Sequence, residues 1–318
     1  MSAPTDYHPS LDDPNAWVPY RYNPSLAAAV IFLIAFTIAT GWHAVTLFRR
    51  RTWYYTPFLI AGIFEIVGYC GRIASTKDLW ALSPYIIQSI LLLVAPALFA
   101  ASIYIVLGRI IRFTGGERYS LVPVKWLTRA FVAGDVVAFL AQMTGGGIQA
   151  GGTISSLNLG EKIIIVGLFL QVIFFGIFIT VATVWHLRFN RQTAVQLNAK
   201  RDVLWRKYMW SLYGGSALIM IRSIFRIIEY LMGNDGFLLR HEYLLYIFDA
   251  LLMFLVMVLF LWLHPSKLTM FETSDVQPGH DMEEGGQVAA RTAGHRPISQ
   301  STSSERKTLL GRFMPSKR

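Results

Sequence analysis

The sequence has little cysteine and little charge. It contains 318 residues with one cysteine, Cys70, and only 15% of the residues are charged. A single cysteine excludes an intramolecular disulfide framework and a zinc site built from cysteines. Because Cys70 lies within an apolar segment, we expect it to be a small, buried packing residue.

Signatures of catalysis and of cofactor binding are also missing. The seven histidines are scattered and not grouped at the spacing of zinc ligands. The glycine run from Thr144 to Gly152 lacks the Gly-Lys-Ser/Thr sequence of a phosphate-binding loop. We expect this run to form a loop, with a flexible lid or a re-entrant turn as alternatives. The sequence thus predicts a protein that is not an enzyme and that has no catalytic residues, no metal and no cofactor.

The chain instead has many apolar residues, which make up 54% of it, and its mean hydropathy is +0.44. This composition is typical of a polytopic membrane protein. Segments of about 20 apolar residues are long enough to cross roughly 30 Å of hydrocarbon. There are seven of these: Leu26 to Phe48, Tyr55 to Ala74, Pro84 to Gly108, Trp126 to Gly145, Lys162 to His186, Tyr208 to Leu231 and Glu242 to His264.

The predicted fold is therefore an all-α bundle of seven transmembrane helices. The loops and the tail on one side carry 21 lysines and arginines, against 3 on the other side. By the positive-inside rule, the N-terminus lies outside and the C-terminus lies in the cytosol. We expect an extracellular segment over 1–24, the transmembrane domain over 25–265 and a disordered cytosolic tail over 266–318, which is a candidate site for regulators.

Charged side chains inside the apolar segments are the candidate functional residues. A charge at the centre of a membrane helix costs about 2.5–3.5 kcal/mol on insertion scales, so it usually faces the bundle interior or a path for substrates. Spacings of four and three place Arg222, Arg226 and Glu229 on one helix face. The candidate substrate-binding residues are Glu65, Arg72, Asp135, Gln142, Arg222, Arg226, Glu229 and Asp249.

The spacings and depths of these residues suggest a polar cavity. A spacing of seven puts Glu65 and Arg72 on one face, and it does the same for Asp135 and Gln142. Counting along the segments places Asp249 and the arginines toward the outer side, with two acids nearer the middle. We infer a cavity that opens to the outer leaflet. The alternative is that these charges only hold the helices together.

Several of these residues also carry a family resemblance. The sequence resembles the fungal lipid-translocating exporters, the family named for resistance to aminocholesterol, which includes exporters of sphingoid long-chain bases. The resemblance covers roughly residues 20–265. It rests on Tyr22-Asn23-Pro24-Ser25, Glu65, Gly68-Tyr69, Arg72, Ala95-Pro96, Tyr104, Asp135, Gln142, Gly145-Gly146-Gly147, the run Arg222 to Tyr230, Gly233, Gly236, His241-Glu242, Tyr246, Asp249-Ala250 and His264-Pro265.

The resemblance implies roles in moving sphingoid bases or related amphiphiles and in resistance to toxic lipids. We expect export toward the outer leaflet and a place in the plasma membrane. The expected partners are a lipid or amphiphile and the membrane, with no nucleic acid. One alternative is a receptor-like sensor of lipid stress that transports nothing. A membrane hydrolase is a second alternative, although the sequence shows no metal cluster or nucleophile for it. A retinal protein is excluded because the seventh segment has no lysine.

Overall fold

The computed structural model describes residues 20, 22–149, 154–193, 199–232 and 237–263. Within these ranges every regular element is helical, and the prediction of an all-α fold is confirmed. The elements are α1 (Leu26–Arg50), η1 (Trp53–Tyr55), α2 (Thr56–Ser75), α3 (Leu82–Phe113), η2 (Glu117–Tyr119), α4 (Val124–Gln149), α5 (Ile154–Thr193), α6 (Ala199–Leu231), α7 (Phe237–Arg240), α8 (Glu242–Leu245), η3 (Tyr246–Leu251) and α9 (Leu252–Trp262).

Seven helical spans in the described residues are long and apolar enough to cross a membrane, as predicted. The first six contain α1 to α6, and the seventh runs from α8 through η3 into α9. The chain is therefore a seven-span membrane protein. Several helices are longer than the apolar segments suggested, and α5 extends over 40 residues. Glu161 and Arg188 lie inside α5, because a charged residue ends the apolar part of a helix without ending its backbone hydrogen bonds.

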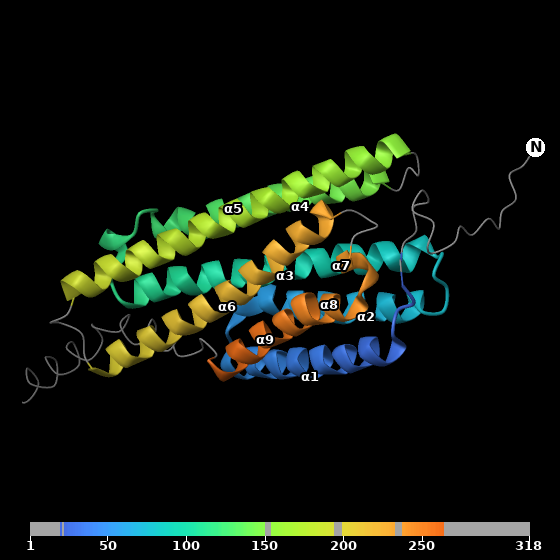
Figure 1. The fold of residues 1–318 in the computed structure, drawn as a ribbon. Helices are drawn as coiled ribbons and strands as arrows, with labels where there is room; N and C mark the ends of the chain where they lie inside the picture. The colour runs from blue at the N-terminus through green and yellow to red at the C-terminus, as the bar shows by residue number, and fades with distance from the viewer. Residues whose placement is uncertain (1–19, 21, 150–153, 194–198, 233–236, 264–318) are drawn as a thin grey trace, which may run out of the picture. The chain divides into compact units, whose positions relative to one another are not determined.

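The third helix lies at the centre of the packing. It contacts α2, α4, α5 and α6, and its side chains Ile103, Tyr104, Val106 and Leu107 are fully buried. The chain closes on itself where α1 packs against α9, and α4 and α5 lie side by side over most of their length (Figure 1). The second and sixth spans thus both pack against α3, and the seventh packs against the sixth and the first.

The glycine run continues α4, which corrects the expectation of a loop. The helix extends through Gly145 to Gly147 and ends at Gln149. A Cβ on Gly145 would lie 2.6 Å from the carbonyl oxygen of Gly160 on α5. The small residue therefore permits a close approach of two helices, which is a common use of glycine in membranes. Residues 150–152 of the run lie outside the described residues.

Cys70 is also placed differently from the prediction. Its side chain is exposed on the surface of the bundle, where isoleucines and valines such as Ile63 and Val67 of the same helix are exposed as well. The opposite face of α2 carries the buried residues Glu65, Tyr69 and Arg72. An apolar segment alone does not distinguish these two faces, because the hydrocarbon of a membrane and a protein core are equally apolar.

The seventh span contains a π-helical turn. Tyr246 to Leu251 form this wider turn between α8 and α9, and Tyr246, Asp249 and Ala250 are buried in it. Short π-helical turns insert one extra residue and are found frequently at functional sites. Here the turn changes which residues of the span face the arginines of α2 and α6.

Candidate functional site

Asp249 of the π-helical turn accepts hydrogen bonds from two arginines of α6. Its Oδ1 accepts a hydrogen bond from Nε of Arg222, and its Oδ2 accepts one at 2.7 Å from Nη2 of Arg226. Arg222 and Asp249 are both buried. The structure brings these three residues together, and the spacing of four places both arginines on one face of α6.

The same arginines are held by further contacts. Nη1 of Arg226 donates to Oε2 of Glu229 at 2.9 Å, three residues along the helix. Nη2 of Arg222 donates to the carbonyl oxygen of Leu92 on α3 at 2.7 Å. The cluster of Arg222, Arg226, Glu229 and Asp249, called the α6 network below, thus carries two positive and two negative charges. Full charge pairing and several hydrogen bonds allow such a group to be buried at all.

Glu65 of α2 is buried beside the α6 network but makes no hydrogen bond and no ion pair in the part of the chain that the structure describes. Asp249, Arg222 and Arg226 are near enough to interact with its charge. Since these three residues already neutralise one another together with Glu229, Glu65 adds a carboxylate that no described cation balances.

Asp135 of α4 is a second buried acid without an ion pair among the described residues. Its Oδ2 accepts a hydrogen bond from the hydroxyl of Tyr104 at 2.8 Å, whereas its Oδ1 has no hydrogen-bond partner. The ring of Tyr104 lies against Phe131 and Phe178, at 5.6 and 4.4 Å between ring centroids. Gln142 lies on the same face of α4 two turns further along, and it donates to the side chain of Gln171 on α5 at 3.1 Å.

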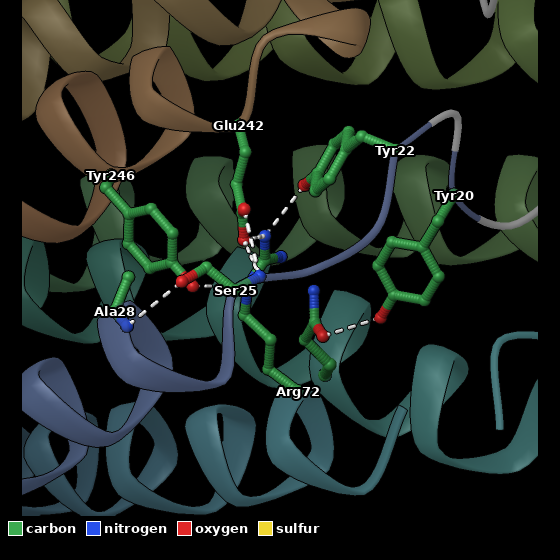
Figure 2. A network of polar contacts seen from close by, with 8 residues as sticks. Tyr20, Tyr22, Ser25, Ala28, Arg72, Glu242 and Tyr246 are labelled. Atoms are coloured by element: carbon green, nitrogen blue, oxygen red, sulfur yellow. Dashed lines mark hydrogen bonds and ion pairs between the residues drawn. The ribbon is translucent and has the colours of Figure 1, made fainter. Parts of the chain in front are cut away.

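Arg72 lies in a different cluster from the one its spacing to Glu65 suggests. Its Nη2 donates to Oε1 of Glu242 at 2.9 Å and to the hydroxyl of Tyr22 at 2.7 Å, and its Nε donates to the hydroxyl of Tyr246 at 2.9 Å. Figure 2 shows Tyr22, which precedes α1, and Glu242 and Tyr246 of the seventh span converging on this guanidinium. The backbone N–H of Ser25 donates to both carboxylate oxygens of Glu242, at 2.8 and 2.9 Å.

Tyr20 and Tyr22 precede α1 and tie it to the other helices. The hydroxyl of Tyr20 donates to the side chain of Gln88 on α3 at 2.8 Å. Burial raises the pKa of both tyrosines above the usual range, with Arg72 acting in the opposite direction. Both hydroxyls therefore remain protonated at neutral pH and keep their hydrogen-bonding roles.

The candidate residues from the sequence thus divide into three groups. The structure brings Arg222, Arg226, Glu229 and Asp249 together with Glu65 beside them; it places Asp135 with Tyr104, and Gln142 with Gln171; and it places Arg72 with Glu242. Sequence reasoning missed Glu242, Tyr22, Tyr246 and Tyr104 as site residues, although the family resemblance includes all four. The binding roles of all these residues, and a cavity opening between them, stay predictions.

The arrangement has an uneven charge balance that bears on chemistry. Arg72, Arg222 and the partly buried Arg226 each contact a carboxylate, whereas Glu65 and Asp135 form no ion pair with any described residue. A carboxylate buried without a counter-charge is costly in an apolar bundle. A positively charged group that entered the bundle would therefore find two acids ready to receive it, while a negatively charged one would have to displace an existing pair.

Comparisons with known proteins complete the description. Residues 58–272 match the family described as "RTA1 like protein". The chain is similar to "Protoporphyrin uptake protein 1" of Saccharomyces cerevisiae, with 36% identity over 77% of this chain and 91% of the relative. It is similar to "Protein RTA1" of the same species, with 35% identity over 77% and 84% of the two chains. It is also similar to "Sphingoid long-chain base transporter RSB1" from a yeast strain, with 26% identity over 81% and 76%.

No solved structure matches the chain. Two of these relatives are described as an uptake protein and a transporter, and the third has the name that the family description also carries. None of the three descriptions names an enzyme. The predicted resemblance to this family is confirmed.

Proposed function

Because the chain belongs to the family of RTA1-like proteins, we propose that it is a membrane transporter that moves a cationic amphiphile toward the outer leaflet. The proposed substrates are sphingoid long-chain bases or related amphiphiles, and the proposed role is resistance to toxic lipids or drugs at the plasma membrane. We also propose the N-terminus outside and the C-terminus in the cytosol. The observation that carries this proposal is the pair of buried acids, Glu65 and Asp135, that form no ion pair within the described part of the chain.

The charges of the bundle fit an ammonium headgroup. A sphingoid base has an ammonium group, hydroxyl groups and one long apolar chain. Glu65 or Asp135 would receive the ammonium, and the free Oδ1 of Asp135 is a ready acceptor. The apolar chain would remain in the lipid beside the exposed isoleucines and valines of the outer faces. The α6 network would keep its own charges paired throughout.

One relative suggests a second substrate class. "Protoporphyrin uptake protein 1" is named for a tetrapyrrole, and that molecule carries two carboxylates. A dicarboxylate would have to displace the acids that Arg72, Arg222 and Arg226 already contact, and two of these arginines share the buried Asp249. The charge balance therefore favours the cationic amphiphile, and the flux assay below separates the two classes.

A sensor of lipid stress is the remaining alternative. It would use the same buried acids to bind an amphiphile, but it would change its conformation or the partners of its tail without moving the lipid. Binding of the amphiphile is therefore expected from a transporter and from a sensor, and only flux distinguishes the two.

The test is flux of a labelled sphingoid base across liposomes that contain the purified full chain, without ATP. Asp135→Asn removes the charge while keeping an acceptor for Tyr104. Glu65→Gln removes the charge of the other acid. Glu161→Gln is the matched control, because Glu161 near the start of α5 lies outside the clusters described above. We expect flux from the wild type and from the control, and a loss of at least about tenfold in each of the two test variants, which corresponds to about 1.4 kcal/mol.

Two results would contradict the proposal. Flux of a tetrapyrrole in place of the sphingoid base would point to the second substrate class. Flux at the level of empty liposomes, from protein that binds the labelled base and elutes as a single folded species, would favour the sensor.

A further inference from the structure

The cluster around Arg72 lies apart from the two unpaired acids, and transport of a cation does not use it. Arg72 is fully buried on α2 and is fixed by bonds from Nε and Nη2. The third nitrogen of its guanidinium, Nη1, is also buried but has no hydrogen-bond partner among the residues that the structure describes. A buried donor of a charged group without a partner is rare and needs an explanation. The site thus has one hydrogen-bond donor, Nη1 of Arg72, for which the described residues supply no acceptor.

Glu242 fills only part of this donor set. Its planar carboxylate accepts from Nη2 of Arg72 and from the backbone N–H of Ser25, which precedes the first turn of α1. The N-terminus of a 25-residue helix favours a negative charge through its free N–H groups and its dipole. A phosphate monoester has three terminal oxygens, one more than a carboxylate, and the third could also reach Nη1.

The element that carries Glu242 is loosely held by comparison. None of the four side chains of α8 is buried, and the Glu242 side chain is 16% exposed, whereas the Arg72 side chain is 0% exposed. The acid can therefore leave the guanidinium toward solvent, but the guanidinium cannot follow it. This asymmetry is expected of an internal occupant that can be exchanged for a ligand.

We propose that Arg72, Tyr22 and the backbone N–H of Ser25 form a binding site for the phosphate of an amphiphile's headgroup, and that the phosphate displaces Glu242 from it. The phosphate would accept hydrogen bonds from Nη1 and Nη2 of Arg72 and from the N–H of Ser25. Glu242, at the start of the seventh span, would turn toward water. The site takes an anion and so differs from the proposed cation path at Glu65 and Asp135; its binding can be present or absent whether or not a sphingoid base is transported.

The test uses the full chain purified in a non-ionic maltoside detergent, so that no lipid phosphate competes. Isothermal titration calorimetry with dodecyl phosphate measures binding, dodecanol shows the contribution of the chain alone, and inorganic phosphate shows that of the free anion. We expect dodecyl phosphate to bind more tightly than either control. We expect Glu242→Gln to raise its affinity by about tenfold or more, because the variant weakens the charge-assisted bonds of the internal competitor.

Three variants complete the design. Arg72→Gln should abolish the binding, and Arg72→Lys, which keeps the charge but loses the planar fork, should weaken it. Glu161→Gln, which neutralises an acid outside the site, should leave it unchanged. If Arg72→Gln fails to fold, the rise in affinity for Glu242→Gln decides the matter by itself.

Three outcomes would overturn the proposal. Equal or weaker binding of dodecyl phosphate to Glu242→Gln would show that Glu242 is a structural partner and not a competitor. Binding of dodecyl phosphate no tighter than that of dodecanol would exclude a phosphate site. Equal binding of inorganic phosphate and dodecyl phosphate would assign the site to a free anion and not to a headgroup.

Discussion

Tyr246 and Asp249 lie three residues apart in one π-helical turn and contact different arginines. The hydroxyl of Tyr246 accepts from Arg72 of α2, and the carboxylate of Asp249 accepts from Arg222 and Arg226 of α6. The wider turn of a π-helix directs residues three apart further away from each other than an α-helix does. The turn therefore connects the two arginine clusters of the bundle, and a return to α-helical geometry would rotate one side chain relative to the other.

Neutralising Asp249 should strongly destabilise the protein. In Asp249→Asn one amide oxygen can accept from one arginine, but the amide N–H₂ faces the donors of the other. Removing one partner of a buried charge pair costs about 3–5 kcal/mol. Thermal unfolding in detergent measures the effect, with Asp78→Asn on an exposed loop acid as the control. Equal midpoints for the two variants would show that the α6 network contributes little to folding.

Arg226 and Glu229 should be energetically coupled. Arg226→Gln leaves Glu229 buried without its partner, and Glu229→Gln removes one of the two acids of Arg226. The double variant removes both charges, so we expect it to be more stable than the sum of the single effects by about 0.5–3 kcal/mol.

A matched cycle between Arg226 and Glu117 serves as the reference for that coupling. Glu117 follows α3 near the opposite end of the helices and contacts Arg112 at 4.0 Å on the surface. The effects of this second pair should add within about 0.3–0.5 kcal/mol, as is usual for distant sites. Additive behaviour of both pairs would contradict the network.

Two neighbouring glycines of α4 should respond in opposite ways to alanine. A Cβ at Gly145 would meet Gly160 and Ile164 of α5 at 2.6 Å, whereas nothing lies within 4 Å of one at Gly146. We expect Gly145→Ala to destabilise the protein by about 1–3 kcal/mol through overpacking. Gly146→Ala should be neutral or stabilise it by up to about 1 kcal/mol through helix propensity. Chemical or thermal unfolding of the two variants side by side checks both, and similar effects would argue against close packing of α4 on α5.

The proposed orientation can be measured with single cysteines. Cys70→Ser provides a background without cysteine, into which Asp78→Cys or Glu117→Cys is introduced; both positions are exposed. If the N-terminus is outside, a membrane-impermeant maleimide should label position 78 in intact cells and position 117 only after permeabilisation. The reverse pattern would show that the N-terminus lies in the cytosol, with the same seven spans.

The α6 network shows how far sequence reasoning reached. Arg222, Arg226 and Glu229 belong to one helix, so a local spacing rule placed them on one face. The contacts of both arginines with Asp249 and of Arg226 with Glu229 agree with it. The partner of Arg72 could not be found in this way. Glu242 lies 170 positions away at the boundary of an apolar segment, where an acid has no unusual meaning. The family resemblance included it, but gave it no partner.

The sequence by itself determined the seven spans, the helical class and the need for buried charges to find partners, because hydrophobic length and the cost of a charge in hydrocarbon are local quantities. Only the tertiary structure decided which charges pair. It left Glu65 and Asp135 without an ion pair to any residue it describes, extended α4 through its glycines and turned Cys70 outward. These features depend on which face of each helix meets another helix, and the contacts among helices far apart in the chain set those faces.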